Sequence, residues 1–243
     1  MRADCKFEVI DETDHWIVVE KSAPLVVHPA NGNPEPTLLG GLQELLIYEI
    51  ANGARLSIIT RLDRETSGLV LVAKNANAAR HFSGQFQRRE VEKDYRAIVH
   101  GWPEWESLSV DAAILRGGGE IWLRRVVDPA GKECATDFQI RRRFENQHGR
   151  FSVVDCFPKT GRMHQIRVHL EHLGHPIIGD KIYGGDGSAY LEQVHGEISD
   201  KSVRQLMLPR HALHACRLAI QWAGQKVEWR SDFPRDLTSF SEP

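Results

Sequence analysis

Hydrophobic and polar positions follow two different periods along the chain, and the changes of period mark its expected elements. Residues 7–10 and 16–21 carry the apolar runs of two short strands, joined by an acidic turn. Leucines and isoleucines then recur at helical spacing from Thr37 to about Ile50, with Thr37 in the N-cap position. The chain is therefore expected to open with a hairpin followed by a helix.

The same periods continue through the middle of the chain. Asn75 can cap a helix in which Ala78, Ala79, Phe82 and Phe86 fall on one face. Alternation over residues 91–99 then predicts a strand that sends Tyr95 to its mainly apolar side. Antiparallel hairpins are expected from 101 to 160, over 108–115, 121–127, 135–144 and 151–157.

A second change of period occurs after residue 160. Met163, Ile166, Leu170 and Leu173 would lie within an arc of about 80° on a helix over 161–173, and Gly174 with Pro176 would end it. Arg167 falls at the edge of this arc, where its stem can be buried while its head reaches a cleft. Residues 188–209 suggest an insertion or a short helix, and 211–222 with 226–233 suggest a closing hairpin.

This order of elements predicts an α+β fold: a mixed, largely antiparallel sheet with a few packed helices. No repeat, low-complexity tract or linker interrupts the chain, so a single domain is expected over residues 1–243. The 243 residues are 41% hydrophobic and 26% charged, which is ordinary for a globular protein. No apolar run is long enough for a membrane span or a signal peptide, so a cytoplasmic location is expected.

Cysteines and histidines do not indicate a metal site. Cys5, Cys134, Cys156 and Cys216 lie far apart without paired spacing, so free thiols are expected. His164, His169, His172 and His175 cluster, but no glutamate completes a metalloprotease pattern. Packing or RNA contact is the favoured interpretation of these histidines, and no metal is expected.

Charge is distributed unevenly along the chain. The net charge is −2, yet residues 80–167 hold 16 of the 31 Lys+Arg and only 12 of the 33 Asp+Glu. A basic middle between acidic ends permits one cationic face. Candidates for phosphate contacts are the arginines at 88–89, 124–125 and 141–143, although a solvated face is the more common explanation for any one of them.

One loop stands out as a place for chemistry. Asp63 lies between Arg61 and Arg64, and turn-forming residues then lead into the apolar run 69–73. A buried strand would hold the carboxylate in place while the loop leaves it accessible. On its own, such a loop is more commonly a solvated turn with surface ion pairs.

Five segments in order change this interpretation: RLDRETSG at 61–68, KDYRA at 93–97, GRMHQIRVH at 161–169, GHPIIGD at 174–180 and LHA at 213–215. Together they resemble the RluA family of RNA pseudouridine synthases, over about residues 7–235. Two positions depart from the family pattern: Thr60 stands where histidine is usual, and Ser22 follows Lys21 where proline is usual.

The resemblance implies an isomerase that needs no cofactor: the bond from uracil N1 to ribose C1′ breaks, the base turns, and C5 is joined to C1′. Asp63 would be the catalytic residue, either trapping the sugar covalently or taking a proton from C2′. Arg167 would lower the pKa of Asp63, and Tyr95 would pack against the base and assist proton removal from C5. Arg61 would fill the space left by the flipped base, and Leu213 would line the pocket.

The implied partner is structured RNA, a stem-loop of ribosomal or transfer RNA. No membrane and no obligate protein partner is expected, and the protein is expected to be a monomer. The separate N-terminal RNA-binding domain of some relatives is expected to be absent, because the first strand begins almost at once. Two alternatives stay open: a non-catalytic RNA-binding protein that keeps this fold, and a hydrolase that uses Asp63 on another glycosidic bond.

Overall fold

The computed structural model describes residues 6–28 and 35–242, and the chain forms two compact units. Unit 1 holds the described residues of 1–93 and 215–232, and unit 2 holds those of 94–214 and 233–243. Both units combine antiparallel strands with helices, so the predicted α+β class with a largely antiparallel sheet is confirmed. The expectation of a single domain over 1–243 stays a prediction.

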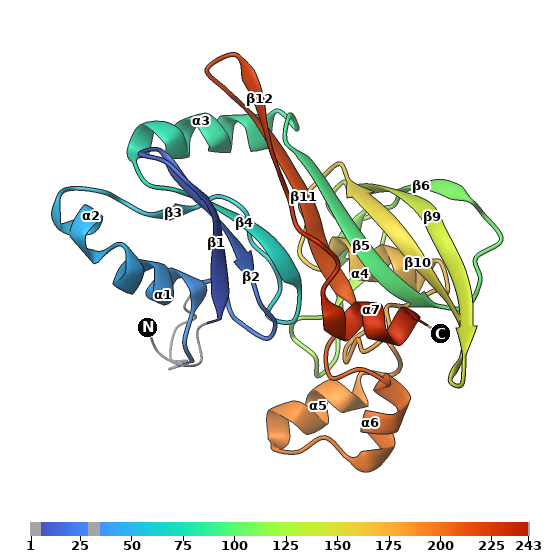
Figure 1. Ribbon diagram of the computed structural model, residues 1–243. Helices are drawn as coiled ribbons and strands as arrows, with labels where there is room; N and C mark the ends of the chain where they lie inside the picture. The colour runs from blue at the N-terminus through green and yellow to red at the C-terminus, as the bar shows by residue number, and fades with distance from the viewer. Residues whose placement is uncertain (1–5, 29–34, 243) are drawn as a thin grey trace. The chain divides into compact units, whose positions relative to one another are not determined.

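Unit 1 is built on five neighbouring strands. They follow the order β1 (Phe7–Glu12), β2 (Trp16–Lys21), β4 (Ser67–Ala73), β11 (Leu213–Trp222) and β12 (Gln225–Arg230), and a short β3 (Ser57–Ile58) also pairs with β4 (Figure 1). The first two residues of β11 belong to unit 2. Both predicted hairpins, at the start of the chain and near its end, are confirmed.

The helices of unit 1 begin where the sequence predicts. Thr37 caps α1 (Leu38–Leu45) by accepting a hydrogen bond from the backbone N–H of Gly40 at 3.1 Å. The expected single helix is interrupted at Leu46, and α2 (Ile47–Ala51) follows it. Asn75 caps α3 (Ala76–Gln87), and its predicted apolar face packs against β2, β4 and the β11–β12 hairpin.

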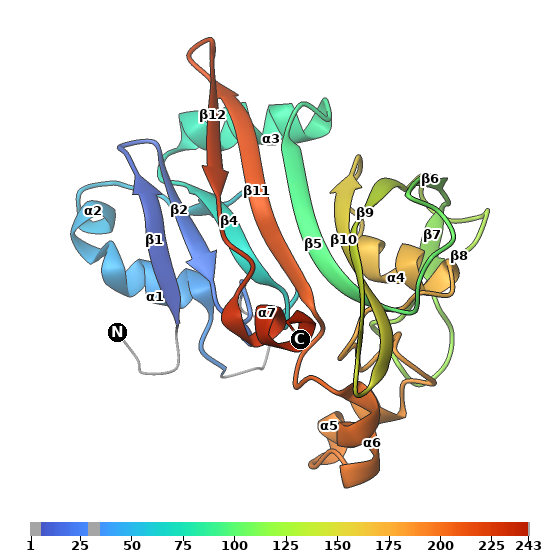
Figure 2. The ribbon, with the colours of Figure 1, turned by 45° about the vertical axis from the view of Figure 1, so that its right-hand side comes forward.

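Unit 2 contains a second set of antiparallel strands. Their order is β5 (Glu92–His100), β10 (Gly149–Pro158), β9 (Ala135–Asn146) and β6 (Ser107–Asp111), and a separate hairpin pairs β7 (Ile114–Arg116) with β8 (Arg125–Val127) (Figure 2). The first two residues of β5 belong to unit 1. Residues 188–209, expected to be an insertion or one short helix, form two helices, α5 (Ser188–His195) and α6 (Asp200–Leu206).

A helix that the sequence did not indicate follows Pro234. In α7 (Arg235–Ser241), Leu237 is fully buried and the Phe240 ring lies 5.1 Å from the Phe151 ring. Because only seven residues are involved, the apolar period is too short to identify. Among the described residues, none of the helices is long and apolar enough to cross a membrane.

The helix α4 (Gln165–His172) corrects the prediction of an amphipathic helix over 161–173. It starts after His164, which has a positive φ of 57°, so Arg162 and Met163 lie outside it and Met163 is 36% exposed. Every residue from 165 to 170 is buried, polar ones included. Periodicity failed here because buried polar side chains are tolerated wherever hydrogen bonds satisfy them.

One glycine of unit 1 permits a prediction about stability. Gly68 has φ +112°, and a Cβ there would collide with the backbone oxygen of Ala215 on β11. Gly68→Ala should therefore lower the free energy of unfolding by about 2 to 4 kcal/mol, since strain and crowding add. The measurement is denaturant unfolding.

The matched control is Gly53→Ala, because Gly53 has φ +100° but a Cβ added to it would have no neighbouring atom within 4 Å among the described residues. This variant should lose only about 1 to 2 kcal/mol from backbone strain. Equal losses in the two variants would show that contact with β11 contributes nothing.

Candidate active site

Asp63 lies on a loop of unit 1 that is anchored to β4. The backbone N–H of Thr66 donates to the carbonyl oxygen of Asp63 at 3.1 Å and closes a turn. Thr60 ties the start of the loop to β4, since its hydroxyl accepts the N–H of Leu71 at 2.7 Å. Asp63 is half-buried, whereas all seven residues of β4 are buried. A rigid strand thus supports a partly accessible carboxylate, as the sequence predicts.

Lys21, at the end of β2, holds the same loop. Its side chain is fully buried, and its ammonium group donates to the carbonyl oxygens of Ser22, Leu25 and Arg64, at 3.1, 2.9 and 3.2 Å. The N–H of Leu25 also donates to the Arg64 carbonyl at 2.9 Å. The residue that follows Asp63 is therefore fixed by two hydrogen bonds from the β2 side.

Arg61 differs from its neighbours on this loop. Its side chain is exposed, and it forms no hydrogen bond or ion pair with any residue in the described part of the chain. Arg64 is also exposed and lies 3.4 Å from Glu35, a pair too accessible to contribute much to stability. The Arg61 guanidinium therefore makes no polar contact on which the fold depends.

Tyr95 and Leu213 belong to unit 2 and share one hydrophobic cluster. Tyr95 sits on β5 opposite Cys156 of β10 and packs, half-buried, against this cluster, on the apolar side that the alternation predicts. Leu213 is 4% exposed within the cluster, which also contains Ile166 of α4. Since Ile166 precedes Arg167, these side chains come from one region of unit 2.

Arg167 makes a buried bidentate ion pair with Asp180. Its Nε and Nη2 atoms donate to the two carboxylate oxygens at 2.6 and 2.9 Å. Burial would raise the pKa of Asp180, but the Arg167 charge and hydrogen bonds outweigh it and hold that pKa far below its usual value. The N–H groups of Ile182 and Tyr183 also bind this carboxylate. The guanidinium head of Arg167 is therefore buried as well as its stem.

Tyr183 completes the surroundings of Arg167. The guanidinium carbon lies 5.0 Å from the centre of the Tyr183 ring. The Tyr183 hydroxyl accepts the backbone N–H of Arg125 at 2.9 Å and lies 2.9 Å from Nδ1 of His164. One buried phenol thus connects the start of α4 with β8 and confines the Arg167 head group on a second side.

The histidines and cysteines have structural surroundings. His169 is fully buried between the Thr136 hydroxyl and the Ala112 carbonyl, each at 2.9 Å, and burial lowers its pKa. Cys134, Cys156 and Cys216 are not joined in disulfides, whereas Cys5 lies outside the described residues. Within residues 6–28 and 35–242, no group of three or more histidine, cysteine or acidic side chains is arranged to hold a metal ion.

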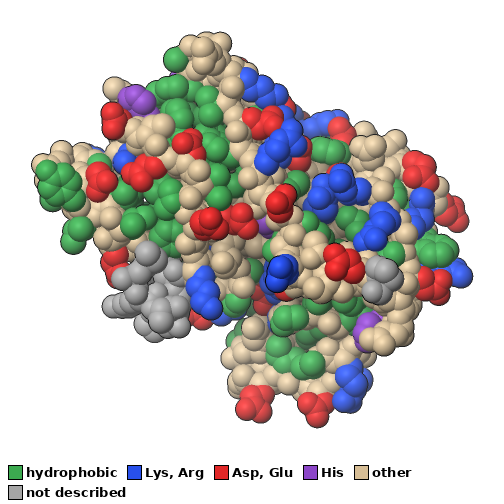
Figure 3. Space-filling model, viewed as in Figure 1, with side chains coloured by type: hydrophobic (Ala, Val, Ile, Leu, Met, Phe, Trp, Pro, Cys, Tyr) green, Lys and Arg blue, Asp and Glu red, His purple; other side chains and the backbone are tan. Residues whose placement is uncertain are grey.

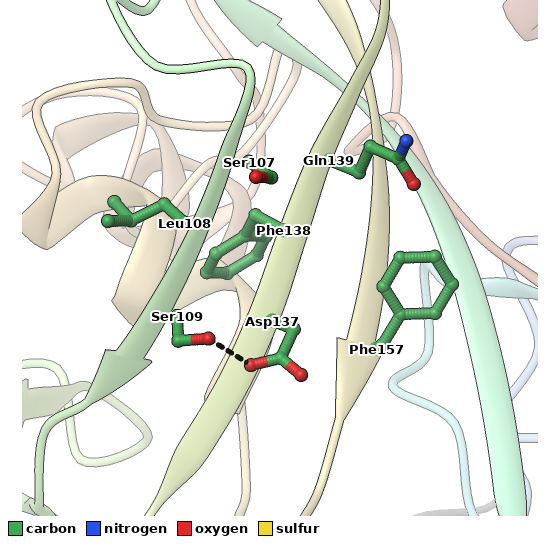
Figure 4. Close-up of a pocket in the computed structure, with 7 residues that line it drawn as sticks. All are labelled: Ser107, Leu108, Ser109, Asp137, Phe138, Gln139 and Phe157. Atoms are coloured by element: carbon green, nitrogen blue, oxygen red, sulfur yellow. Dashed lines mark hydrogen bonds between the residues drawn. The ribbon is translucent and has the colours of Figure 1, made fainter.

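A shallow pocket of about 470 Å³ lies on the unit 2 strands (Figure 4). Its lining comes from β6, β9 and β10 and includes Ser109, Phe157 and Asp137, whose carboxylate accepts the Ser109 hydroxyl at 2.6 Å. None of the candidate residues lines this pocket. It therefore takes no part in the candidate site.

Lysine and arginine side chains gather over β5, β9 and β10 on the face seen in Figure 3. Arg96 and Arg141 both pair with Asp155, at 2.7 and 3.3 Å, and Arg143 pairs with Glu106 at 2.6 Å. Two members of the expected 141–143 phosphate-binding run thus pair with acidic side chains, and Arg141 shares its carboxylate with Arg96.

The candidate residues fall into two sets. Asp63 and Arg61 share a loop of unit 1, and Tyr95, Arg167 and Leu213 belong to unit 2. Sequence reasoning gave no role to Lys21, Asp180 or Tyr183. Asp180 closes the segment 174–180 that carries part of the resemblance, and this position was the available signal for it.

Comparisons with known proteins identify the family of this chain. The family model for RNA pseudouridylate synthase matches residues 15–172. The ribosomal large subunit pseudouridine synthase D of Pseudomonas aeruginosa is 37% identical over 237 residues, covering 96% of this chain and 70% of that protein. Its namesake in Zymomonas mobilis is 33% identical over 244 residues, covering 96% and 71%. The structure of human RNA pseudouridylate synthase domain containing 1 superposes with a TM-score of 0.75 at 25% identity, covering 98% of this chain and 88% of that one.

Fold and sequence together define a protein of the pseudouridine synthase class. The chain belongs to the RNA pseudouridylate synthase family and, within it, to the RluA family. It is therefore an isomerase, an RNA pseudouridine synthase, as the five sequence segments predicted.

The buried pair gives a prediction about stability. Asp180→Asn should lower the free energy of unfolding by about 3 to 5 kcal/mol, because Arg167 loses its bidentate carboxylate in a buried site. Asp155→Asn is the control, since Asp155 binds two arginines at the more accessible β5–β10 surface and should cost at most about 1 kcal/mol. Denaturant unfolding at pH 7 measures both.

The pH dependence of stability should also reveal this ion pair. The pKa of Asp180 is lower in the folded than in the unfolded chain. The contribution of Asp180 to the free energy of unfolding is therefore complete above about pH 4 and decreases as pH falls further. Asp180→Asn should flatten the stability curve below pH 4. An unchanged curve would contradict the pairing.

Proposed function

We propose that this enzyme converts uridine to pseudouridine in large-subunit ribosomal RNA, with Asp63 as the catalytic residue. The observation that supports ribosomal RNA as the substrate is the 37% identity, across 96% of the chain, with a protein named for the large ribosomal subunit. Transfer RNA was the other substrate expected from the sequence, and the names of the relatives favour ribosomal RNA.

Asp63 suits this reaction because its side chain is a carboxylate and because its loop is held in place. Breaking a glycosidic bond builds positive charge at C1′, which an ionised carboxylate can stabilise or trap. Abstraction of the C2′ proton by the same oxygen is the second route. Either route needs the carboxylate held within a fraction of an ångström. The hydrogen bonds of Thr60 and Lys21 restrict the loop before and after Asp63.

In the proposed site Arg167 meets Asp63 and keeps it ionised. An adjacent guanidinium typically lowers a carboxylate pKa by about 1 to 3 units, which would offset desolvation by the bound base. Asp180 takes the Nε edge of Arg167 and would act as its positioning residue. Support for joining the two sets of residues comes from the family membership and the five ordered segments.

The remaining residues would hold the nucleotide. Tyr95 would pack against the uracil and assist removal of the C5 proton, and Leu213 would line the pocket beside it. Arg61 would enter the space that the flipped base leaves, a role compatible with its exposed guanidinium. Flipping a nucleotide out of its stack costs a few kcal/mol, and this cost is smallest in loops. An unpaired uridine is therefore the favoured target.

The proposal requires neither a cofactor nor a metal, because the base is rejoined to the sugar from which it came. The partner is structured ribosomal RNA, and the protein would act as a monomer without an obligate protein partner. Its relatives are bacterial enzymes named for the ribosome, which supports action in the cytoplasm.

The central prediction concerns Asp63→Asn. Complementing a strain that lacks this protein with the parent should restore specific pseudouridines in large-subunit ribosomal RNA, and the variant should restore none. In vitro, the variant should release tritium from C5-labelled uridine in that RNA on the order of 1,000-fold more slowly. Asp14→Asn, at an exposed turn of unit 1, should match the parent.

Each opposing outcome has a definite meaning. Restoration of pseudouridines by Asp63→Asn would remove this residue from the mechanism. Free uracil among the products would establish the hydrolase, and restoration confined to transfer RNA would overturn the proposed substrate.

Tyr95→Phe tests the proton-removal role. The variant keeps the ring, so its Kd for the RNA should stay within about two-fold of the parent, while tritium release should slow by about 100-fold or more, as loss of a general base does. Tyr190→Phe on the half-buried part of α5 is the control. Equal rates in Tyr95→Phe and the parent would rule out the phenol as the base.

A further inference from the structure

An exposed tryptophan lies against an arginine on the hairpin of β7 and β8. Trp122 is 67% exposed, and the guanidinium carbon of Arg116 lies 2.8 Å from the centre of its ring. Large aromatic side chains are usually buried, and tryptophan is enriched at binding interfaces. The function described above uses neither residue.

The loop that carries Trp122 is firmly held. Ile121, the preceding residue, is 5% exposed within a hydrophobic cluster that contains Tyr183 and Val168. The N–H of Gly117 donates to the Arg124 carbonyl, and the N–H of Arg124 donates to the Ile121 carbonyl, both at 3.0 Å. The Trp122 ring is thus carried by a preorganised loop, and preorganisation lowers the entropy cost of binding.

Four arginines lie on or beside this loop, and one of them, Arg124, pairs with Glu171 at 3.2 Å. Arg125 donates to the carbonyl oxygens of residues 122–124, at 3.1 to 3.4 Å, and to the Met163 sulfur at 3.0 Å. Arg162, beside Met163, donates to the Glu133 carbonyl at 3.0 Å. Within the described chain, Arg116, Arg125 and Arg162 form no ion pair, whereas Arg141 and Arg143 on β9 pair with carboxylates. The positive charge of Arg116, Arg125 and Arg162 is therefore not neutralised by the described residues.

The loop is also connected to the surroundings of Arg167. The backbone N–H of Arg125 donates to the Tyr183 hydroxyl, and the Tyr183 ring lies beside the Arg167 guanidinium. His164, which precedes α4, contacts the same hydroxyl. A ligand on Trp122 would thus be held at a fixed position relative to Arg167.

We propose that Trp122, backed by Arg116, stacks against an unpaired base of the RNA substrate outside the catalytic pocket, while Arg125 and Arg162 contact its flanking phosphates. The proposal rests on the RNA substrate of the proposed function. Aromatic rings and guanidinium planes are the groups on which single-stranded bases stack, and nearby arginines bind the backbone. Such a contact holds the RNA while the target uridine is flipped.

The test compares Trp122→Ala and Trp122→Phe with the parent, using an unmodified transcript of large-subunit ribosomal RNA. Trp122→Ala should raise KM for tritium release and Kd for the transcript about ten-fold, with kcat within about two-fold. Trp122→Phe should recover most of the loss, because a smaller ring still stacks. Arg162→Met should reduce the salt dependence of binding by about one phosphate contact.

Trp102→Ala is the matched control. Trp102 also lies in unit 2, is 40% exposed and has Arg150 at 4.5 Å from its ring, but its indole donates to the Phe144 carbonyl. This variant should bind and react like the parent.

Parental KM and Kd in Trp122→Ala would overturn the stacking site. A lower kcat with a lower melting temperature and unchanged Kd would also overturn it, because the residue would then only support the loop. Failure of the proposed function is distinguishable: the parent itself would not modify the transcript, whereas the binding comparison would still test Trp122.

Discussion

The buried ion pair between Arg167 and Asp180 is the interaction on which the candidate site of unit 2 depends. Placing two charges in a dry interior costs several kcal/mol per ion, and only good geometry with further hydrogen bonds offsets that cost. Asp180 meets this condition, since it binds both Nε and Nη2 of Arg167 and accepts two backbone N–H groups. The result is a guanidinium whose orientation is set by the fold.

Unit 1 uses a buried cation in a related way. The Lys21 ammonium is held by three carbonyl oxygens, one of them on the residue after Asp63. A flexible surface turn around Asp63 is thereby converted into a fixed one. In both units a buried charged group with several hydrogen bonds restricts the position of a residue with a proposed chemical role.

The arginines of unit 2 divide into two groups with different consequences. Arg96 of β5 and Arg141 of β9 share Asp155, and Arg143 pairs with Glu106, so part of their charge is offset within the chain. Arg116, Arg125 and Arg162, near the β7–β8 hairpin, contact carbonyl oxygens, a sulfur or an aromatic ring. The count of basic residues along the sequence could not separate these groups, because the acidic partners come from different strands and connections.

Local sequence determined much of this protein by itself. Apolar runs gave β2 and β4, and alternation gave β5. Side-chain caps at Thr37 and Asn75 gave the starts of α1 and α3, and the five ordered segments gave the family. These features depend on contacts between near neighbours, or on motifs that are legible in one dimension. The meeting of Asp63 with Tyr95 and Arg167 stays a prediction.

Tertiary structure alone decided the rest. The burial of α4 on all sides, the partnership of Arg167 with Asp180 and the helix α7 depend on groups far apart along the chain. A period of apolar residues cannot reveal them, because a buried polar side chain is stable only when a distant partner satisfies its hydrogen bonds, and that partner is brought near by folding.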